Sequence, residues 1–188
     1  LEAERDKLWL TISDLQGIIP PYIPEGSTHA YHMYRMRFDP RLAGYDVDSG
    51  RFTKALELAM IAEGLPLRFY QNIPVPGQVL FQMKEGFGDG IPWSLPNTNA
   101  IRYDIEDYPV TLDVLENTRC IGASGTSGPN YFMNRKTMHD YVTAFHKVWE
   151  HLDEVVDHSR KMEYKVPWSN FAPSTRGSWT IYAPGAKK

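Results

Sequence analysis

The sequence is poor in the features of secreted proteins. It has one cysteine, Cys120, in 188 residues, and no Asn-x-Ser/Thr sequon. A single cysteine cannot form an intramolecular disulfide framework, and without a sequon there is no N-glycosylation acceptor. The first residues are charged and helix-like, and they lack the basic start and apolar core of a signal peptide. We therefore expect a cytoplasmic protein.

Long apolar runs and a strong charge of one sign are also missing. No apolar stretch approaches the roughly 20 residues that cross a bilayer, so we expect no membrane insertion. The formal net charge is −3, and acidic and basic residues are interspersed. A broad basic surface is absent, which argues against nucleic-acid binding. The 42% hydrophobic content is ordinary for a globular protein with one substantial domain.

The apolar periodicity predicts an α/β protein with helices packed on a small sheet. Alternation along His29 to Phe38 places Ala30 and His32 on one face of a strand. Ser49 is a plausible N-cap for a helix that Gly64 closes, and Asn134 for the longest helix. The predicted helices span residues 1–16, 51–63, 109–117 and 135–156, and the predicted strands span 29–38, 65–70 and 119–122.

Residues 71–106 hold many of the proline, glycine and asparagine residues, with scattered aromatic side chains. Compact domains seldom leave so long a connection structureless unless it has a function. We expect an ordered loop that covers a site. After Lys161 the sequence loses its periodicity and predicts an irregular tail that lies on a surface.

The strand at residues 29–38 carries an unusual aromatic and imidazole pattern. It follows a helix and a Pro-rich linker, and it contains in order a small residue, an aromatic residue, His, an apolar residue and Tyr. This order resembles the start of the C-terminal small domain of the DegT/DnrJ/StrS family of pyridoxal-phosphate-dependent sugar aminotransferases. The matching residues are Ala30, Tyr31, His32, Met33 and Tyr34.

Three further segments are similar to the same family. They are the helix end at Glu63 to Leu67, the acidic-aromatic-Pro sequence of Asp107, Tyr108 and Pro109, and the helix from Arg135 to about Val156. The resemblance covers about residues 1–157. It implies the small C-terminal domain of a fold-type I aminotransferase. The implied divisions are an interdomain helix and linker (1–26), the small domain (27–157) and an irregular extension (158–188).

The resemblance implies a function that this chain performs only as part of an assembly. Such enzymes transfer an amino group from an amino acid, commonly glutamate, to a keto-sugar or cyclitol. Their cofactor lysine lies in a Ser-x-x-Lys pattern of the large domain, and none of the nine lysines here has Ser three positions earlier. Pyridoxal 5'-phosphate would be bound mainly by a large domain absent from this chain. The implied partners are that large domain, a sugar or cyclitol substrate and a second copy in a homo-oligomer.

The residues at and beyond the second predicted strand are the candidate substrate-binding residues. Arg68 could contact an anionic group, Tyr70 falls near a His that family members place toward the sugar, and Gln71 or Asn72 could bond hydroxyls. Ordinary polar residues at a strand end are an equally good interpretation. His32 is a secondary candidate, and a histidine packed in the strand and bonded to backbone is favoured over a catalytic one.

Two other hypotheses remain for the chain. One is a non-catalytic interaction or regulatory module derived from such a small domain. The other is metal-dependent hydrolysis, which the number of histidine and acidic residues keeps open although the histidines lack metal-ligand spacing. Cys120, beside Arg119, is either a thiol of lowered pKa or, more typically for one cysteine in a short apolar strand, a packing residue.

Overall fold

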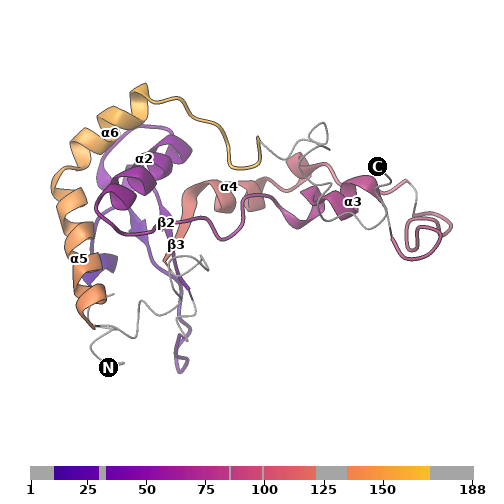
Figure 1. Cartoon of the computed structure of the whole chain (residues 1–188), viewed down its shortest axis with the longest axis horizontal. Helices are drawn as coiled ribbons and strands as arrows, with labels where there is room; N and C mark the ends of the chain where they lie inside the picture. The colour runs from indigo at the N-terminus through magenta and orange to yellow at the C-terminus, as the bar shows by residue number, and fades with distance from the viewer. Residues whose placement is uncertain (1–10, 30–32, 85, 99, 122–134, 170–188) are drawn as a thin grey trace. The chain divides into compact units, whose positions relative to one another are not determined.

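The computed structural model describes residues 11–29, 33–84, 86–98, 100–121 and 135–169, and the chain forms two compact units (Figure 1). The first unit comprises residues 1–70 and 116–164. The second comprises residues 71–115 and 165–188. The chain therefore leaves the first unit after Tyr70 and returns to it at Glu116.

A three-stranded antiparallel sheet lies in the first unit. Its strands are β1 (Ile18–Ile19), β2 (Tyr34–Phe38) and β3 (Thr118–Ile121), and β2 is central. The strand prediction is confirmed over β2, where buried Tyr34, Met36 and Phe38 alternate with more exposed arginines. The sequence did not predict β1, because two residues are too few to show a period.

Helices of the first unit cover one face of this sheet. They are α2 (Ser49–Ala62), α5 (Arg135–Glu150) and α6 (Leu152–Lys161), and residues 11–13 are also helical. The first predicted helix was expected to reach residue 16, but a turn follows residue 13. The N-cap of α2 is Asp48 rather than Ser49, because the Asp48 carboxylate accepts a hydrogen bond from the Arg51 amide.

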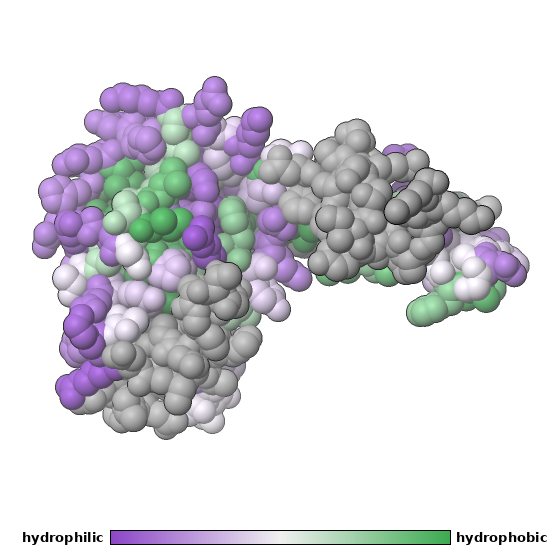
Figure 2. Space-filling model, in the orientation of Figure 1, coloured by the Kyte–Doolittle hydropathy of each residue, from purple (hydrophilic) through white to green (hydrophobic). Residues whose placement is uncertain are grey.

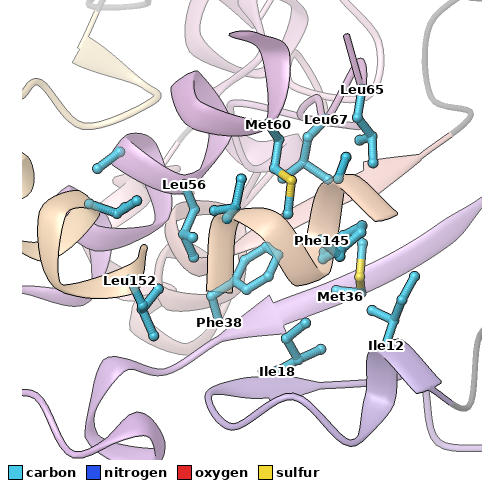
Figure 3. Packing of buried hydrophobic residues seen from close by; sticks show 14 of the residues in the cluster. Ile12, Ile18, Met36, Phe38, Leu56, Met60, Leu65, Leu67, Phe145 and Leu152 are labelled. Carbon is cyan, nitrogen blue, oxygen red and sulfur yellow. The ribbon is translucent and has the colours of Figure 1, made fainter. Parts of the chain in front are cut away.

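The hydrophobic core lies between the sheet and these helices (Figure 3). Met36 and Phe38 of β2 point toward Leu56 and Met60 of α2 and toward Phe145 of α5. Burial of such side chains contributes about 1.5–3 kcal/mol each, so this cluster dominates the stability of the first unit. The remaining members of the cluster shown with labels are Ile12, Ile18, Leu65, Leu67 and Leu152.

The long C-terminal helix is interrupted. The sequence predicted one helix over residues 135–156, whereas α5 ends at Glu150 and α6 begins at Leu152, after a turn at His151. Both helices bury apolar residues in the same core, so the apolar stripe continues across the break and conceals it. Asp153 and Glu154 in the first turn of α6 are the signal for a new helix N-terminus.

The predicted strand at residues 65–70 is an extended segment with one bridge to the sheet. Leu65 and Leu67 are fully buried, while Arg68 and Tyr70 are exposed. The Arg68 amide donates to the Cys120 carbonyl at 3.0 Å, and the Cys120 amide donates to the Arg68 carbonyl at 2.7 Å. Only this pair of hydrogen bonds joins the segment to β3, so no regular strand forms.

The second unit contains short helices and an aromatic cluster. Trp93 packs edge-on against Phe81 and Tyr103, and its indole N–H donates to the Tyr103 hydroxyl at 2.9 Å. The expectation of ordered structure is confirmed for the described residues of 71–106, whereas the expectation that they cover a site stays a prediction. The helix predicted at 109–117 is confirmed as α4. The helical segments are η2 (Val75–Gly77), α3 (Val79–Met83), η3 (Ile105–Asp107) and most of α4 (Pro109–Asn117), whose last two residues belong to the first unit, as does η1 (Pro40–Ala43).

No helix in the described part of the chain combines the length and the apolar character needed to cross a membrane. The longest of them, α5, is amphipathic: Met138, Phe145 and Val148 are buried, and charged side chains such as Lys136 and Lys147 are exposed. Its apolar face is covered by the core of the first unit.

Candidate functional site

Arg68 and Tyr70 lie at the edge of the sheet in the first unit. Alternation along the extended segment sends Leu67 and Phe69 toward the helices and leaves Arg68 and Tyr70 on the opposite side. Tyr70 is 53% exposed. Both side chains are therefore exposed at the surface, and their role in a substrate-facing wall stays a prediction.

A buried arginine lies behind this segment. Arg119 of β3 is 0% exposed, and its guanidinium carbon lies 3.6 Å from the centroid of the Phe69 ring. The bridge between Arg68 and Cys120 places Phe69 directly opposite Arg119, so this is a cross-strand cation–π contact. It fixes the side on which Phe69 lies and, by alternation, the side on which Arg68 and Tyr70 lie.

Glu57 of α2 neutralises the buried arginine. Arg119 Nε donates to Glu57 Oε2 at 2.6 Å, and Arg119 Nη1 donates to the carbonyls of Glu116 and Thr118. Lys54 donates to the other Glu57 oxygen at 2.7 Å. Burial lowers the pKa of the Arg119 guanidinium, and the charge and hydrogen bond of Glu57 oppose that shift. Arginine stays protonated in proteins, so the pair is ionic.

The sequence analysis did not identify this ion pair. The sequence offered only a partial signal, because Glu57 falls among the apolar residues of a predicted helix; the structure shows that it is buried, with 3% exposure. A carboxylate on an apolar stripe needs a partner, and Arg119 within a wholly buried strand is the basic residue that meets that need. Arg119 Nη2 has no hydrogen-bond partner in the part of the chain that the structure describes.

The sheet face opposite the helices is basic. The register pairs Arg35 of β2 with Cys120, and the bridge pairs Cys120 with Arg68, so the three side chains form a row on that face. Cys120 is buried. Burial raises the pKa of its thiol, while the positive charge and hydrogen bond of Arg35 oppose the shift. A thiol that stays protonated is a packing residue rather than a nucleophile.

The other predicted site residues lie elsewhere. Gln71 and Asn72 belong to the second unit, Gln71 exposed and Asn72 half-buried. His32 lies outside the described residues. The structure thus brings Arg68 and Tyr70 together on one side of one segment, and the roles of Gln71, Asn72 and His32 stay predictions.

A second polar cluster lies at the N-terminal end of α2. The Tyr164 hydroxyl donates to Glu116 Oε1 at 2.6 Å, and burial together with this bond raises the pKa of Tyr164 far above its usual value. Gly50 lies beneath the pair, where an added Cβ would overlap both side-chain ends. These contacts fasten residues beyond α6 to the start of α2, so their role is structural.

A groove runs between α2, α5 and α6 with a volume of about 470 Å³. Its floor is apolar, and Figure 2 shows hydrophobic side chains gathered there with hydrophilic ones around them. Polar contacts line the rim: Lys147 forms an ion pair with Glu63 at 2.7 Å, and His151 Nδ1 lies 3.0 Å from Glu154 Oε1, within hydrogen-bond distance. These polar groups satisfy one another, so the groove offers a ligand few available partners.

Two lysines and the grouping of acidic, histidine and cysteine side chains bear on whether the described part of the chain can hold a cofactor or a metal ion. Lys54 and Lys147 are held in ion pairs on helix surfaces. A Schiff-base lysine must instead reach its cofactor as a neutral amine, so these residues do not fit pyridoxal phosphate. Within the same described ranges, no three His, Cys, Asp or Glu side chains are grouped to hold a metal ion.

Comparison with protein-family models and with curated proteins gives no relative from which a function could be carried over. No protein-family model matches the chain, and no curated protein matches it. The functional argument therefore depends on the residues and on the geometry described above.

Proposed function

We propose that this chain is the C-terminal small domain, or half, of a pyridoxal-phosphate-dependent aminotransferase similar to the DegT/DnrJ/StrS family. It acts with a large domain that carries the cofactor and the reactive lysine. The assembled enzyme transfers an amino group from an amino acid to a keto-sugar or cyclitol. This chain supplies a wall of the substrate pocket.

The observation that carries the proposal is the placement of Arg68 and Tyr70. Both are exposed at the edge of the sheet, on a segment whose buried side is fixed by Leu67 and by the contact between Phe69 and Arg119. Binding residues work best when a rigid scaffold holds them at its surface. A guanidinium and a phenol so placed suit a substrate that has both hydroxyl and anionic groups.

The positions of the resembling segments support the same proposal. The pattern ending at Tyr34 leads directly into β2, and the segment Glu63 to Leu67 joins α2 to the edge of the sheet. Pro109, which closes the third segment, is the first residue of α4. These three segments thus coincide with element boundaries, where a sequence pattern is most constrained by structure, whereas the segment from Arg135 to about Val156 begins with α5 but crosses the break at His151.

Each residue would have a separate task in the assembled pocket. The Arg68 guanidinium donates hydrogen bonds to an anionic group, and the Tyr70 hydroxyl bonds a ring hydroxyl. The amides of Gln71 and Asn72 can each donate to and accept from sugar hydroxyls. When bound to the large domain, pyridoxal phosphate supplies the electron sink of the reaction.

The test is to co-produce the chain with a large-domain chain that contains the Ser-x-x-Lys pattern. The purified assembly should show the visible absorbance of bound pyridoxal phosphate, which borohydride abolishes, and should move an amino group from glutamate to a keto-sugar. Arg68→Gln and Tyr70→Phe should raise KM for the keto substrate while the cofactor stays bound, and Arg160→Gln on α6 should not. A colourless, inactive assembly would contradict the proposal.

One observation favours the alternative of a non-catalytic interaction module. Several large apolar side chains of the second unit are exposed, among them Leu80 and Phe87. Exposed large apolar side chains are one feature of protein-binding surfaces. A module of this kind would bind an intact aminotransferase and change its rate, and Arg68→Gln would then leave KM for the keto substrate unchanged.

A further inference from the structure

We propose that Arg35 and Arg68 form a binding site for an anionic group, a carboxylate or a phosphate, on the sheet face opposite the helices. The assignment of that anion to the keto substrate rests on the proposed function. The binding site itself rests on the register of the sheet and on the charges that the register places side by side.

The geometry places the two arginines on either side of one residue. Arg35 is paired with Cys120 on one side and Arg68 with Cys120 on the other, so all three side chains leave the same face. Neighbouring strands lie about 4.8 Å apart, which separates the two arginine backbones by roughly 10 Å. Extended arginine side chains can converge across that distance over the Cys120 side chain.

No carboxylate in the described part of the chain neutralises the charges of these arginines. Arg35 and Arg68 are exposed, and within the described residues neither forms an ion pair with a carboxylate. Arg37 lies two residues further along the same face, but its charge has an acidic neighbour, because it helps to lower the pKa of the Asp39 carboxyl. Two uncompensated guanidinium groups on one face repel each other, and a bound anion removes that repulsion.

The support behind the site is rigid. Arg68 is held by two backbone hydrogen bonds to Cys120, and the next residue, Phe69, is stacked on the buried Arg119. Arg35 belongs to β2, the central strand, which is bonded on both sides. Two guanidinium groups carried on anchored backbone favour planar or tetrahedral oxyanions, which can accept two parallel hydrogen bonds from one guanidinium.

The test is a titration of the full chain, followed through the side-chain Nε–H signals of arginine in NMR spectra. Sodium phosphate and sodium malonate are the two probes, each with sodium chloride balancing the ionic strength. We expect saturable shifts of the Arg35 and Arg68 signals with at least one probe. Arg35→Gln and Arg68→Gln should each weaken binding at least about tenfold, and Arg160→Gln, an exposed arginine of α6, should leave it unchanged.

Conservative variants keep the test decisive. Arg35→Lys and Arg68→Lys retain the charge but lose the fork, so binding should fall less than with Gln. The tighter of the two probes identifies the group as phosphate or carboxylate. Linear shifts without saturation for both probes, or an equal loss in Arg160→Gln, would overturn the site. The titration needs neither cofactor nor large domain, so its outcome is independent of the aminotransferase assay.

Discussion

Gly64 is the residue whose backbone most directly ends an element. It follows α2 with a φ of 82°, its amide donates to the Ile61 carbonyl at 3.0 Å, and no atom lies within 4 Å of an added Cβ. Gly64→Ala should therefore lower the free energy of unfolding by about 1–2 kcal/mol through backbone strain alone. Urea unfolding measures the loss. Gly64→Asn should cost less, because Asn tolerates the left-handed region, and an Ala variant as stable as the parent would contradict this account.

Asp39 makes stability depend on pH. Its carboxylate accepts bonds from the Arg41 amide and from Arg41 Nε and Nη2, and the side-chain bonds are the main reason that its pKa lies below the usual 3.8. A lowered pKa means stability that is present above the unfolded value and lost as the pH falls through the folded value. The difference in unfolding free energy between the parent and Asp39→Asn should thus be constant above about pH 5 and shrink below pH 4.

Urea unfolding at several pH values measures that difference. Arg41→Gln removes the cationic partner and should reduce the same acid dependence. If the difference in unfolding free energy between the parent and Asp39→Asn grows as the pH falls, the predicted direction of the pH dependence is wrong. The contribution itself is small, because Arg41 is largely exposed and solvent screens the pair.

At the scale of elements, the pair of Glu57 and Arg119 joins α2 to β3. Glu57→Gln leaves a buried guanidinium without its counter-charge and should lower the free energy of unfolding by about 3–5 kcal/mol. The double variant Glu57→Leu with Arg119→Met removes both charges and should lose much less than the sum of Glu57→Leu and Arg119→Met. Denaturant unfolding of the parent, the two single variants and the double variant completes this double-mutant cycle. Additive losses would mean that the two charges act independently.

The sequence predicted elements well where a pattern was long. Helix α2 and strand β2 show clear periods, and Pro109 marks the start of α4. The break at His151 was missed because residues on both sides of it pack in the same core. The segment at 65–70 has the composition of a strand, yet only Arg68 finds a bridging partner. Pairing partners distant in the sequence are not visible to local periodicity.

The sequence predicted Arg68 and Tyr70 as site residues from their position beside a predicted strand. The structure shows that both are exposed, and their role in binding stays a prediction. The row formed by Arg35, Cys120 and Arg68 could not be predicted, because it depends on the register of three segments. Likewise, Arg119 lies 62 residues from Glu57 in the sequence, and only tertiary packing brings the two charges together.

At the scale of the whole molecule, apolar surface on the second unit should affect association. Phe87 is 86% exposed and Leu80 is 51% exposed. The double variant Leu80→Ser with Phe87→Ser should bind less of a hydrophobic dye and self-associate less, while unfolding free energy changes little because both side chains already meet solvent. Dye fluorescence and sedimentation velocity measure these effects. Leu42→Ser, in the first unit, is the control; an equal decrease there would contradict the assignment.

The paired hydrogen bonds between Arg68 and Cys120 also bear on how such a chain can change. They hold neighbouring backbone at the two points where residues 71–115 depart and return. A short connector could join those two points, and so could a longer segment of different sequence. In either case the hydrophobic core of the first unit would stay packed. The first unit therefore serves as a scaffold into which residues 71–115 are inserted, and a change in that insertion need not alter the core of the scaffold.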